Sequence, residues 1–394
     1  MPVIALVDGE HHPTAVRAAL DSLDERRGVA GVVFCGGEEK LGPGSLDEHY
    51  GRPTRDDPEA ALRDLASGAE TVVDLADEPV LPAGAKLELA SLALHLGLSF
   101  ETPGARLDPP SYEEIAFAGP KLAVIATGKR TGKTAVAGHW AALLRDRDPV
   151  IVSMGRGGPA EPRLAEADTG LDDLLAIVDE GGHGASDYLE DAVLAGVHTV
   201  GCRRVGGGFA GQPAESNVRA GAELAVSLDP GLILFEGSGA CIPPVEVDRT
   251  LCILGAGQPE PFAGYRLLRA DLVLAAGEQA PQGALRFELR PEPAEELPSG
   301  ARVAFFTTGA PRVEGVEPVV TSTNLARRSA LAEDLEEAES EGCDVYLTEL
   351  KAAAIDTVAT RARENGARVT FVRNRPVGLE ADLDAALLAL ATDG

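Results

Sequence analysis

The segment from Ala126 to Thr134 constrains the fold of this chain more than any other. It reads Ala-Thr-Gly-Lys-Arg-Thr-Gly-Lys-Thr, with an apolar run at 122–125 before it and a helical pattern at 135–144 after it. A strand, a glycine-rich turn ending in Gly-Lys-Thr and a helix together predict a nucleotide phosphate cradle. The free N–H groups and the dipole at the start of such a helix favour an anion there.

In such a loop, the Lys133 ammonium reaches the β- and γ-phosphates, and the Thr134 hydroxyl holds Mg²⁺. The spacing departs from the usual Gly-x-x-x-x-Gly-Lys-[Ser/Thr] pattern, because position 127 is Thr and the glycine follows at 128. The alternative is a helix start carrying a surface basic cluster. We expect the nucleotide to contact Thr127, Gly128, Thr131, Gly132, Lys133 and Thr134.

Composition restricts the class of protein. The 394 residues are enough for two or three domains, and 44% of them are hydrophobic, as in a globular protein. The chain has no apolar run of about 18 residues, so we expect no membrane span. The N-terminus does not resemble a signal peptide, and the five cysteines lack metal-ligand spacing, which favours a reducing cytoplasm. A net charge of −28 disfavours binding to nucleic acid or to anionic membranes.

Strand and helix patterns alternate along the chain, which predicts an α/β fold with mostly parallel sheets. The proline-rich stretches 102–110 and 290–298 are predicted to be linkers. We therefore expect a central P-loop NTPase domain flanked by two smaller Rossmann-like α/β domains. Their predicted limits are 1–110, 119–290 and 300–394.

Acidic residues follow two of the predicted elements of the central domain. The apolar strand 232–235 ends at Glu236, which is the expected carboxylate partner for Mg²⁺ beside a phosphate loop. The alternative role of Glu236 is that of a turn or capping acid. Asp187 follows the glycine-rich loop 181–184 and is either a helix N-cap or a second metal ligand or base.

Several basic side chains are predicted to bind an anionic substrate. Arg156, Arg203 and Arg204 lie in glycine-rich segments at the ends of predicted strands, where open α/β sheets bind ligands. The arginine fork matches phosphate oxygens, and glycines let a ligand approach the backbone. His11 follows the first predicted strand and is a further candidate for ligand contact. Taken singly, each arginine is equally well explained as a surface residue.

With these residues in view, the chain resembles the cyclic 2,3-diphosphoglycerate synthetase family. The resemblance rests on four motifs and extends over most of the chain. The motifs are Asp8-Gly9-Glu10-His11, the loop 127–134, Ser153-Met154-Gly155-Arg156-Gly157-Gly158 and Glu236-Gly237-Ser238-Gly239. The loop and the Glu-Gly pair also resemble those of dethiobiotin synthetase and related P-loop ligases, although Ala126 stands where that group often has glycine.

The resemblance implies a ligase that converts ATP and 2,3-diphosphoglycerate into cyclic 2,3-diphosphoglycerate, ADP and phosphate. This reaction brings the phosphates of ATP and of the substrate together, and all of them are anions. We therefore expect positioning and charge neutralisation to dominate catalysis. The catalytic residues are then expected to be Lys133, Lys129, Arg130 and Asp187, with Thr134 and Glu236 on Mg²⁺. Arg156, Arg203, Arg204 and His11 would bind the substrate.

Two other functions stay open at this point. One is a ligase of the dethiobiotin synthetase type that acts on a carboxylate or carbamate, which would need fewer arginines near the crevice. The other is a regulatory P-loop switch, although the chain lacks the Asn-Lys-x-Asp motif that reads guanine. We further expect a homodimer, the commonest oligomeric state.

Overall fold

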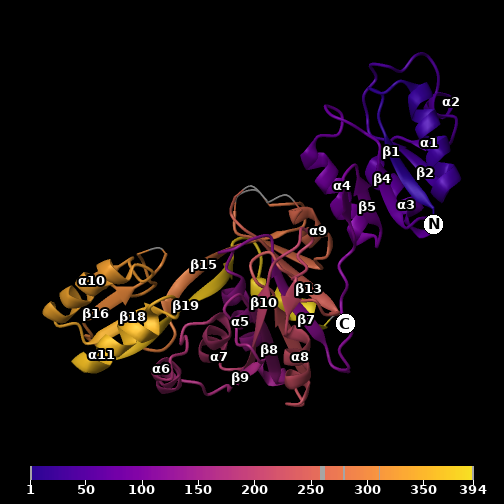
Figure 1. The fold of residues 1–394 in the computed structure, drawn as a ribbon. Helices are drawn as coiled ribbons and strands as arrows, with labels where there is room; N and C mark the ends of the chain where they lie inside the picture. The colour runs from indigo at the N-terminus through magenta and orange to yellow at the C-terminus, as the bar shows by residue number, and fades with distance from the viewer. Residues whose placement is uncertain (1, 258–261, 278–279, 310, 393–394) are drawn as a thin grey trace. The chain divides into compact units, whose positions relative to one another are not determined.

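The computed structural model of the protein describes residues 2–257, 262–277, 280–309 and 311–392. The chain forms two compact units, each with its own sheet (Figure 1). The first unit comprises Met1–Ser111, Phe209–Gly211 and Pro259–Arg269, and the second comprises Tyr112–Gly208, Gln212–Gln258 and Ala270–Gly394. The three domain ranges expected from the sequence stay predictions.

The first unit is a six-stranded sheet in the order β3-β2-β1-β4-β5-β6, parallel except for the pair β5–β6. Every residue of β1 is buried, as expected for a central parallel strand. The strands are β1 (Val3–Val7), β2 (Val29–Phe34), β3 (Thr54–Arg55), β4 (Thr71–Asp74), β5 (Ser99–Thr102) and β6 (Ala105–Leu107). The helices are α1 (Pro13–Arg27), α2 (Leu46–Tyr50), α3 (Pro58–Leu65), η1 (Ala66–Gly68), α4 (Ala83–His95) and α9 (Ala263–Leu268).

The expectation of a plain linker at 102–110 was wrong in part. Residues 105–107 form β6, which pairs antiparallel with β5. The turn between them contains Pro103 and Gly104, and Gly104 has a φ of 85°. A Pro-Gly pair reverses the chain as readily as it ends a domain, so the same residues serve a hairpin here.

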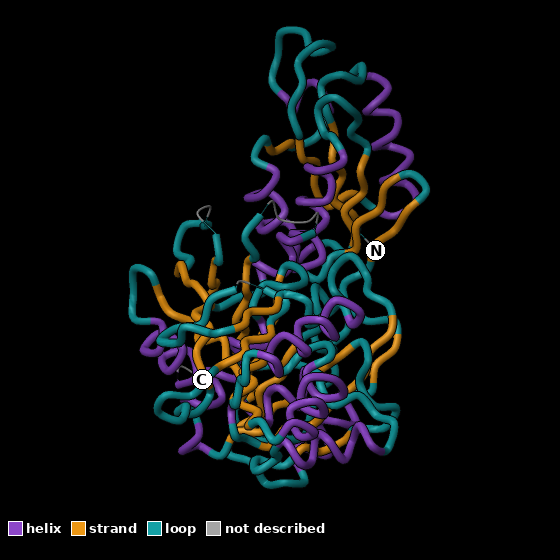
Figure 2. Tube along the Cα trace, turned by 90° about the vertical axis from the view of Figure 1, so that its left-hand side faces the viewer, coloured by secondary structure: helices purple, strands orange, loops and turns teal. Residues whose placement is uncertain are grey.

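The second unit contains one long mixed sheet. Its strands are β7 (Lys121–Ala126), β8 (Pro149–Gly155), β9 (Arg163–Ala165), β10 (His198–Val205), β11 (Glu215–Ser216), β12 (Leu232–Glu236), β13 (Arg249–Leu254), β14 (Leu272–Ala275), β15 (Leu285–Pro293), β16 (Val303–Phe306), β17 (Val320–Ser322), β18 (Val345–Glu349) and β19 (Arg368–Gly378). The order is β11-β10-β8-β12-β7-β13-β14-β15-β19-β18-β16-β17, with β9 on β10. Figure 2 shows these strands gathered among helices. The predicted α/β class with mostly parallel sheets is confirmed.

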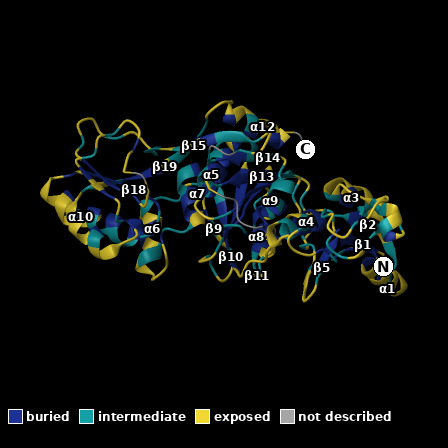
Figure 3. Cartoon of the chain, turned by 90° about the horizontal axis from the view of Figure 1, so that it is seen from above, coloured by how far each residue is buried: buried dark blue, intermediate teal, exposed yellow. Residues whose placement is uncertain are grey.

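Helices cover the strands of this unit on both sides. They are α5 (Lys133–Leu143), η2 (Arg145–Arg147), α6 (Leu171–Asp179), α7 (Asp187–Ala195), α8 (Val218–Val226), α10 (Arg328–Ser340), the π-helix η3 (Ala354–Ala359), α11 (Thr360–Asn365) and α12 (Leu383–Thr392). One core joins α5 and α12 to the strands, with Trp140 and Leu387 fully buried in it. On the opposite face α8 packs so closely that a Cβ at Gly221 would meet Val152 and Val200. The strands are the most buried elements in Figure 3.

The expectation of a linker at 290–298 was also wrong in part. Residues up to Pro293 belong to β15, which pairs antiparallel with β19 from Phe287 to Pro293. Its other edge pairs with β14 only at Leu285 and Arg286. Proline lacks an N–H but is tolerated where one strand edge is unpaired, so Pro291 and Pro293 continue the strand.

A second core connects the C-terminal lobe, which we define as residues 303–309 and 311–372, to the part that carries the phosphate loop. It joins Ile355 and Val358 of η3 to Leu175 of α6 and Leu189 of α7. The lobe is therefore packed directly on α6 and α7. No helix in the described ranges combines the length and the apolar character needed to cross a bilayer.

Candidate active site

The predicted phosphate loop lies between β7 and α5, as expected. Gly132 is the N-cap of α5 and has a φ of 89°, which L-residues rarely adopt. A Cβ there would also lie 2.8 Å from Leu289 Cδ1. Arg130 has a φ of 58°, so two left-handed residues shape the turn. The first N–H groups of an α-helix lack intrahelical partners, so the start of α5 offers donors to an anion.

Glu236 connects the loop to the neighbouring strands. It is the last residue of β12, is 1% exposed, and its Oε1 accepts from Lys133 Nζ at 3.0 Å and from Thr134 Oγ1 at 2.7 Å. Its Oε2 accepts from Ser153 Oγ on β8 at 2.6 Å. Burial alone would raise the pKa of Glu236, but the Lys133 charge and these hydrogen bonds hold it below the ordinary value. Glu236 is therefore an anion beside the start of α5.

Three more acids face this centre from the first turns of α7. Asp187, Glu190 and Asp191 stand at i, i+3 and i+4, so they share one side of the helix. Burial and then the charge of Glu236 raise the pKa of Asp187. Burial raises the pKa of Glu190 to about 7, although the Lys351 charge opposes this shift.

Asp191 is the most unusual of these acids. It is 2% exposed, and among the described residues neither carboxyl oxygen forms a hydrogen bond of normal geometry, although the carboxyl lies beside that of Glu236. Burial and the charges of Glu236 and Glu190 raise its pKa well above the ordinary value. A buried, unpaired carboxyl costs folding free energy, so its presence beside a nucleotide loop points to a cationic ligand.

The donor set fits Mg²⁺. That ion prefers hard oxygen ligands and usually takes one or two carboxylates together with phosphate oxygens. Thr134, Glu236 and Asp187 supply such oxygens, and the unpartnered oxygens of Asp191 lie beside them. Over the described ranges, no group of three or more His, Cys, Asp or Glu side chains could hold a metal alone.

The predicted cations lie in different surroundings. Lys129 and Arg156 both contact Gly239, since a Cβ there would meet Arg156 Nη2 at 2.8 Å and Lys129 Cγ at 3.4 Å. Burial raises the pKa of Asp187, and Arg156 is close enough for its charge to oppose that rise; Lys129, Arg130 and Arg156 are all exposed. The structure thus brings Lys133, Thr134, Glu236, Asp187, Lys129 and Arg156 into one region of the second unit.

Arg203 and Arg204 already use donors on backbone carbonyls. Arg203 Nε donates to Ala160 O at 3.1 Å. Arg204 is 7% exposed and donates to Gly206 O at 2.6 Å and to Ser238 O at 3.0 Å. These bonds hold the loops around the site, so a substrate role for either arginine, which stays a prediction, has to compete with them.

His11 belongs to the first unit. Its Nδ1 lies 2.9 Å from Oδ1 of the fully buried Asp8, which also accepts from the backbone N–H groups of Glu10 and Asp77. Burial raises the pKa of Asp8, but hydrogen bonds from His11 and the Asp77 backbone outweigh it and leave the pKa lowered. The substrate role of His11 stays a prediction.

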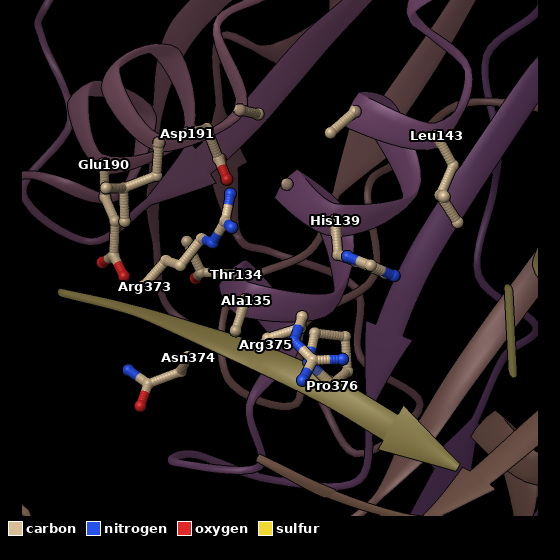
Figure 4. Close-up of a pocket in the computed structure, with 14 residues that line it drawn as sticks. Thr134, Ala135, His139, Leu143, Glu190, Asp191, Arg373, Asn374, Arg375 and Pro376 are labelled. Carbon is tan, nitrogen blue, oxygen red and sulfur yellow. The ribbon is translucent and has the colours of Figure 1, made fainter. Parts of the chain in front are cut away.

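A cavity of about 250 Å³ opens beside the acids, between α5, α7 and β19. Figure 4 shows Glu190 and Asp191 on one wall and Arg373, Asn374 and Arg375 on β19. The two arginines share Glu292, with N–O distances of 2.7 and 2.9 Å. Thr134 also lines the cavity, so the cavity extends to the first turn of α5.

Sequence reasoning missed Glu190, Asp191, Ser153 and Lys351 as site residues. The i, i+3, i+4 spacing of the α7 acids was a usable signal, because it places all three on one helical face. Lys351, which follows the apolar strand 345–347, could have been noted for the same reason as Glu236. Ser153 belongs to one of the motifs that carry the family resemblance, but inside a buried strand it shows no helical spacing and no position at a strand end.

The chain matches three models of one family. The N-terminal, P-loop and C-terminal domain models of cyclic 2,3-diphosphoglycerate synthetase match residues 2–108, 121–282 and 296–375. A solved structure, LpxK from Aquifex aeolicus in complex with ATP, is similar over 71% of this chain and 90% of that chain, at 13% identity. Its TM-score is 0.43.

Curated relatives cover almost the whole chain. A protein named cyclic 2,3-diphosphoglycerate synthetase from Rubrobacter xylanophilus is 45% identical, over 99% of this chain and 97% of its own. Proteins of the same name from Methanothermobacter thermautotrophicus and Thermococcus kodakarensis are 36% and 37% identical, over 98% of this chain and 95% and 98% of theirs. The chain therefore belongs to the cyclic 2,3-diphosphoglycerate synthetase family.

Proposed function

We propose that this protein is an ATP-dependent ligase that closes 2,3-diphosphoglycerate into cyclic 2,3-diphosphoglycerate, with release of ADP and phosphate. The observation that carries the proposal is the contact of Lys133 and Thr134 with Glu236 at the start of α5, in a chain whose relatives bear this enzyme's name. Such an arrangement suits phosphoryl transfer, in which positioning and charge neutralisation supply most of the catalysis.

In this proposal the loop 127–134 binds the ATP phosphates. The donors are the backbone N–H groups at the start of α5 and the Lys133 ammonium, which is 9% exposed. Thr134 and Glu236 would hold Mg²⁺, with Asp187 as a further ligand or base. When bound, Mg²⁺ would neutralise phosphate charge at this position.

The reaction joins two phosphates of one molecule. A substrate phosphate oxygen attacks the γ-phosphorus of ATP, and the bond to ADP breaks. The second substrate phosphate then attacks the phosphorus of the first, and the added phosphoryl group leaves as inorganic phosphate. No protein nucleophile is needed. Lys129 and Arg130 would stabilise the transferring group, while Arg156, Arg203, Arg204 and His11 would bind the substrate.

We also propose that the protein works in the cytoplasm as a homodimer. The cytoplasm supplies ATP, and a reducing compartment suits Cys35, Cys202, Cys241 and Cys343, which are free thiols. The dimer is proposed only as the commonest oligomeric state. Sedimentation of the purified protein tests it, and a monomer at working concentration would contradict it.

The test of the reaction is ³¹P NMR of the protein with Mg-ATP and 2,3-diphosphoglycerate. We expect a new pyrophosphate resonance that grows in step with ADP and free phosphate. Equal ATP consumption without the acceptor would instead support a regulatory switch. No consumption would reject 2,3-diphosphoglycerate as the substrate and point to another phosphorylated or carboxylated compound.

A further inference from the structure

Lys351 lies where an open α/β sheet binds ligands. It follows β18, and in the strand order β19-β18-β16-β17 the chain leaves β16 for β17 on one side and leaves β18 for β19 on the other. The carboxyl ends of β16 and β18 therefore flank a topological switch point. Beside Lys351, Glu349 accepts from the backbone N–H and the hydroxyl of Thr308, at 2.7 and 2.8 Å.

The backbone next to Lys351 has an uncommon conformation. Ala352 has a φ of 50°, a value rare for a residue with a Cβ, and the π-helix η3 follows at Ala354. Left-handed non-glycine residues and π-helical turns are found preferentially at functional sites, where the surrounding structure maintains them. The backbone therefore turns sharply after β18, and this turn fixes the position of the Lys351 Cα.

Packing of the C-terminal lobe fixes the position of Lys351 relative to α7. Gly184, in the loop that leads to Asp187, packs so tightly on η3 that a Cβ there would lie 3.0 Å from Ile355 Cγ2. Ile355 and Val358 share a buried core with Leu189 of α7. Because dense cores resist deformation, the lobe and the acidic face of α7 keep their relative positions.

The Lys351 ammonium faces the candidate active site without being fully engaged. Its Nζ lies 3.6 Å from Glu190 Oε1, beyond normal hydrogen-bond length, and the side chain is 40% exposed. Glu190, Glu349 and Asp187 raise the pKa of Lys351, so it stays charged. The ion pair with Glu190 is thus a long one, and the partly exposed Lys351 side chain is accessible to a further anion.

We propose that Lys351 binds a phosphate group of the acceptor substrate, so that the C-terminal lobe supplies part of the acceptor site. The inference rests on the proposed function. A diphosphorylated carboxylate carries more negative charge than Lys133 can neutralise while it serves ATP. Arg203 and Arg204 already give some of their donors to backbone carbonyls, and Lys351 adds a further cation beside Glu190 and Asp187.

The test measures binding of 2,3-diphosphoglycerate by calorimetry and steady-state KM values for both substrates. We expect Lys351→Met to weaken 2,3-diphosphoglycerate binding and raise its KM at least tenfold, with little change in the KM for ATP. Lys351→Arg should recover part of the loss because the charge is kept. The matched control is Arg363→Met, which removes an exposed cation from the same lobe and should bind as the wild type does.

Several outcomes would overturn the inference. Unchanged binding by Lys351→Met would do so, and so would a rise confined to the KM for ATP. A third such outcome is that Glu190→Gln weakens substrate binding as much as Lys351→Met does. That result would show that Lys351 serves only as the partner of Glu190. A wild type that binds 2,3-diphosphoglycerate but forms no cyclic product rejects the proposed reaction, while the binding comparison still decides the role of Lys351. A wild type that does not bind the compound rejects both.

Discussion

Lys133 Nζ lies 3.0 Å from Glu236 Oε1, which joins the first residue of α5 to the last residue of β12. The two residues are far apart in sequence and meet because β12 and β7 are neighbouring parallel strands. Thr134 and Ser153 bind the same carboxylate. The pair therefore sets the position of the cation and of the anion around which a nucleotide and its metal would be arranged.

Replacing Lys133 by Ala is expected to lower turnover at least about 100-fold, because a donor aimed at phosphate charge is lost. The measurement is the rate of product formation by ³¹P NMR at saturating substrates. Lys40→Ala, which removes an exposed lysine of the first unit, is the control. A Lys133→Ala variant with near wild-type turnover would reject the ATP-binding role of the loop.

Glu236→Gln is expected to weaken the apparent affinity for Mg²⁺ by about 10- to 100-fold, since the amide keeps the shape but loses the charge. Activity measured against Mg²⁺ concentration, together with binding of Mn²⁺ followed by electron paramagnetic resonance, checks this. Glu246→Gln on the same unit serves as the control. If both variants need the same Mg²⁺ concentration, Glu236 is not a metal ligand.

The ligand-free protein is expected to lose stability as pH rises, in part through Glu190. Its folded pKa, about 7, lies above the ordinary value of 4.5, so the folded state binds the proton more tightly than the unfolded state does. This contribution is complete below about pH 4.5 and disappears as pH rises through about 7. It amounts to at most about 3 kcal/mol.

Glu190→Gln should therefore flatten the fall in stability between these pH values. Urea unfolding at a series of pH values, without nucleotide or metal, measures it. The exposed Glu364→Gln is the control and should follow the wild-type profile. Parallel pH profiles for Glu190→Gln and the wild type would show that Glu190 ionises in the folded protein as it does in water.

Gly132→Ala is expected to lower nucleotide affinity by at least tenfold. Alanine would have to adopt the φ of 89° that Gly132 has, which L-residues rarely do, and its Cβ would lie 2.8 Å from Leu289 Cδ1. The turn before α5 must therefore shift. Titration with ATP followed by calorimetry gives the affinity. Gly68→Ala is the matched control, because nothing lies within 4 Å of its Cβ position and its φ is not positive. Equal affinities for the two variants would mean that the loop tolerates the shift.

Local sequence predicted the elements and the centre of the candidate site. Apolar runs placed the strands to within a few residues, as for β7 and β12, and the acid after an apolar run marked Glu236. The same reasoning misread the prolines of β15, because a proline looks alike in a linker and in a strand with one free edge.

The sequence by itself determined the strand-turn-helix unit at 121–143, since its apolar periodicity and Gly132 act over a few neighbouring residues. Only the tertiary structure decided that Asp191 is buried without a partner and that Arg204 donates to Gly206 and Ser238. It also decided that Lys351 meets Glu190. These contacts depend on strand order and on the packing of η3 against α7, and local residue patterns do not encode which distant segments become neighbours.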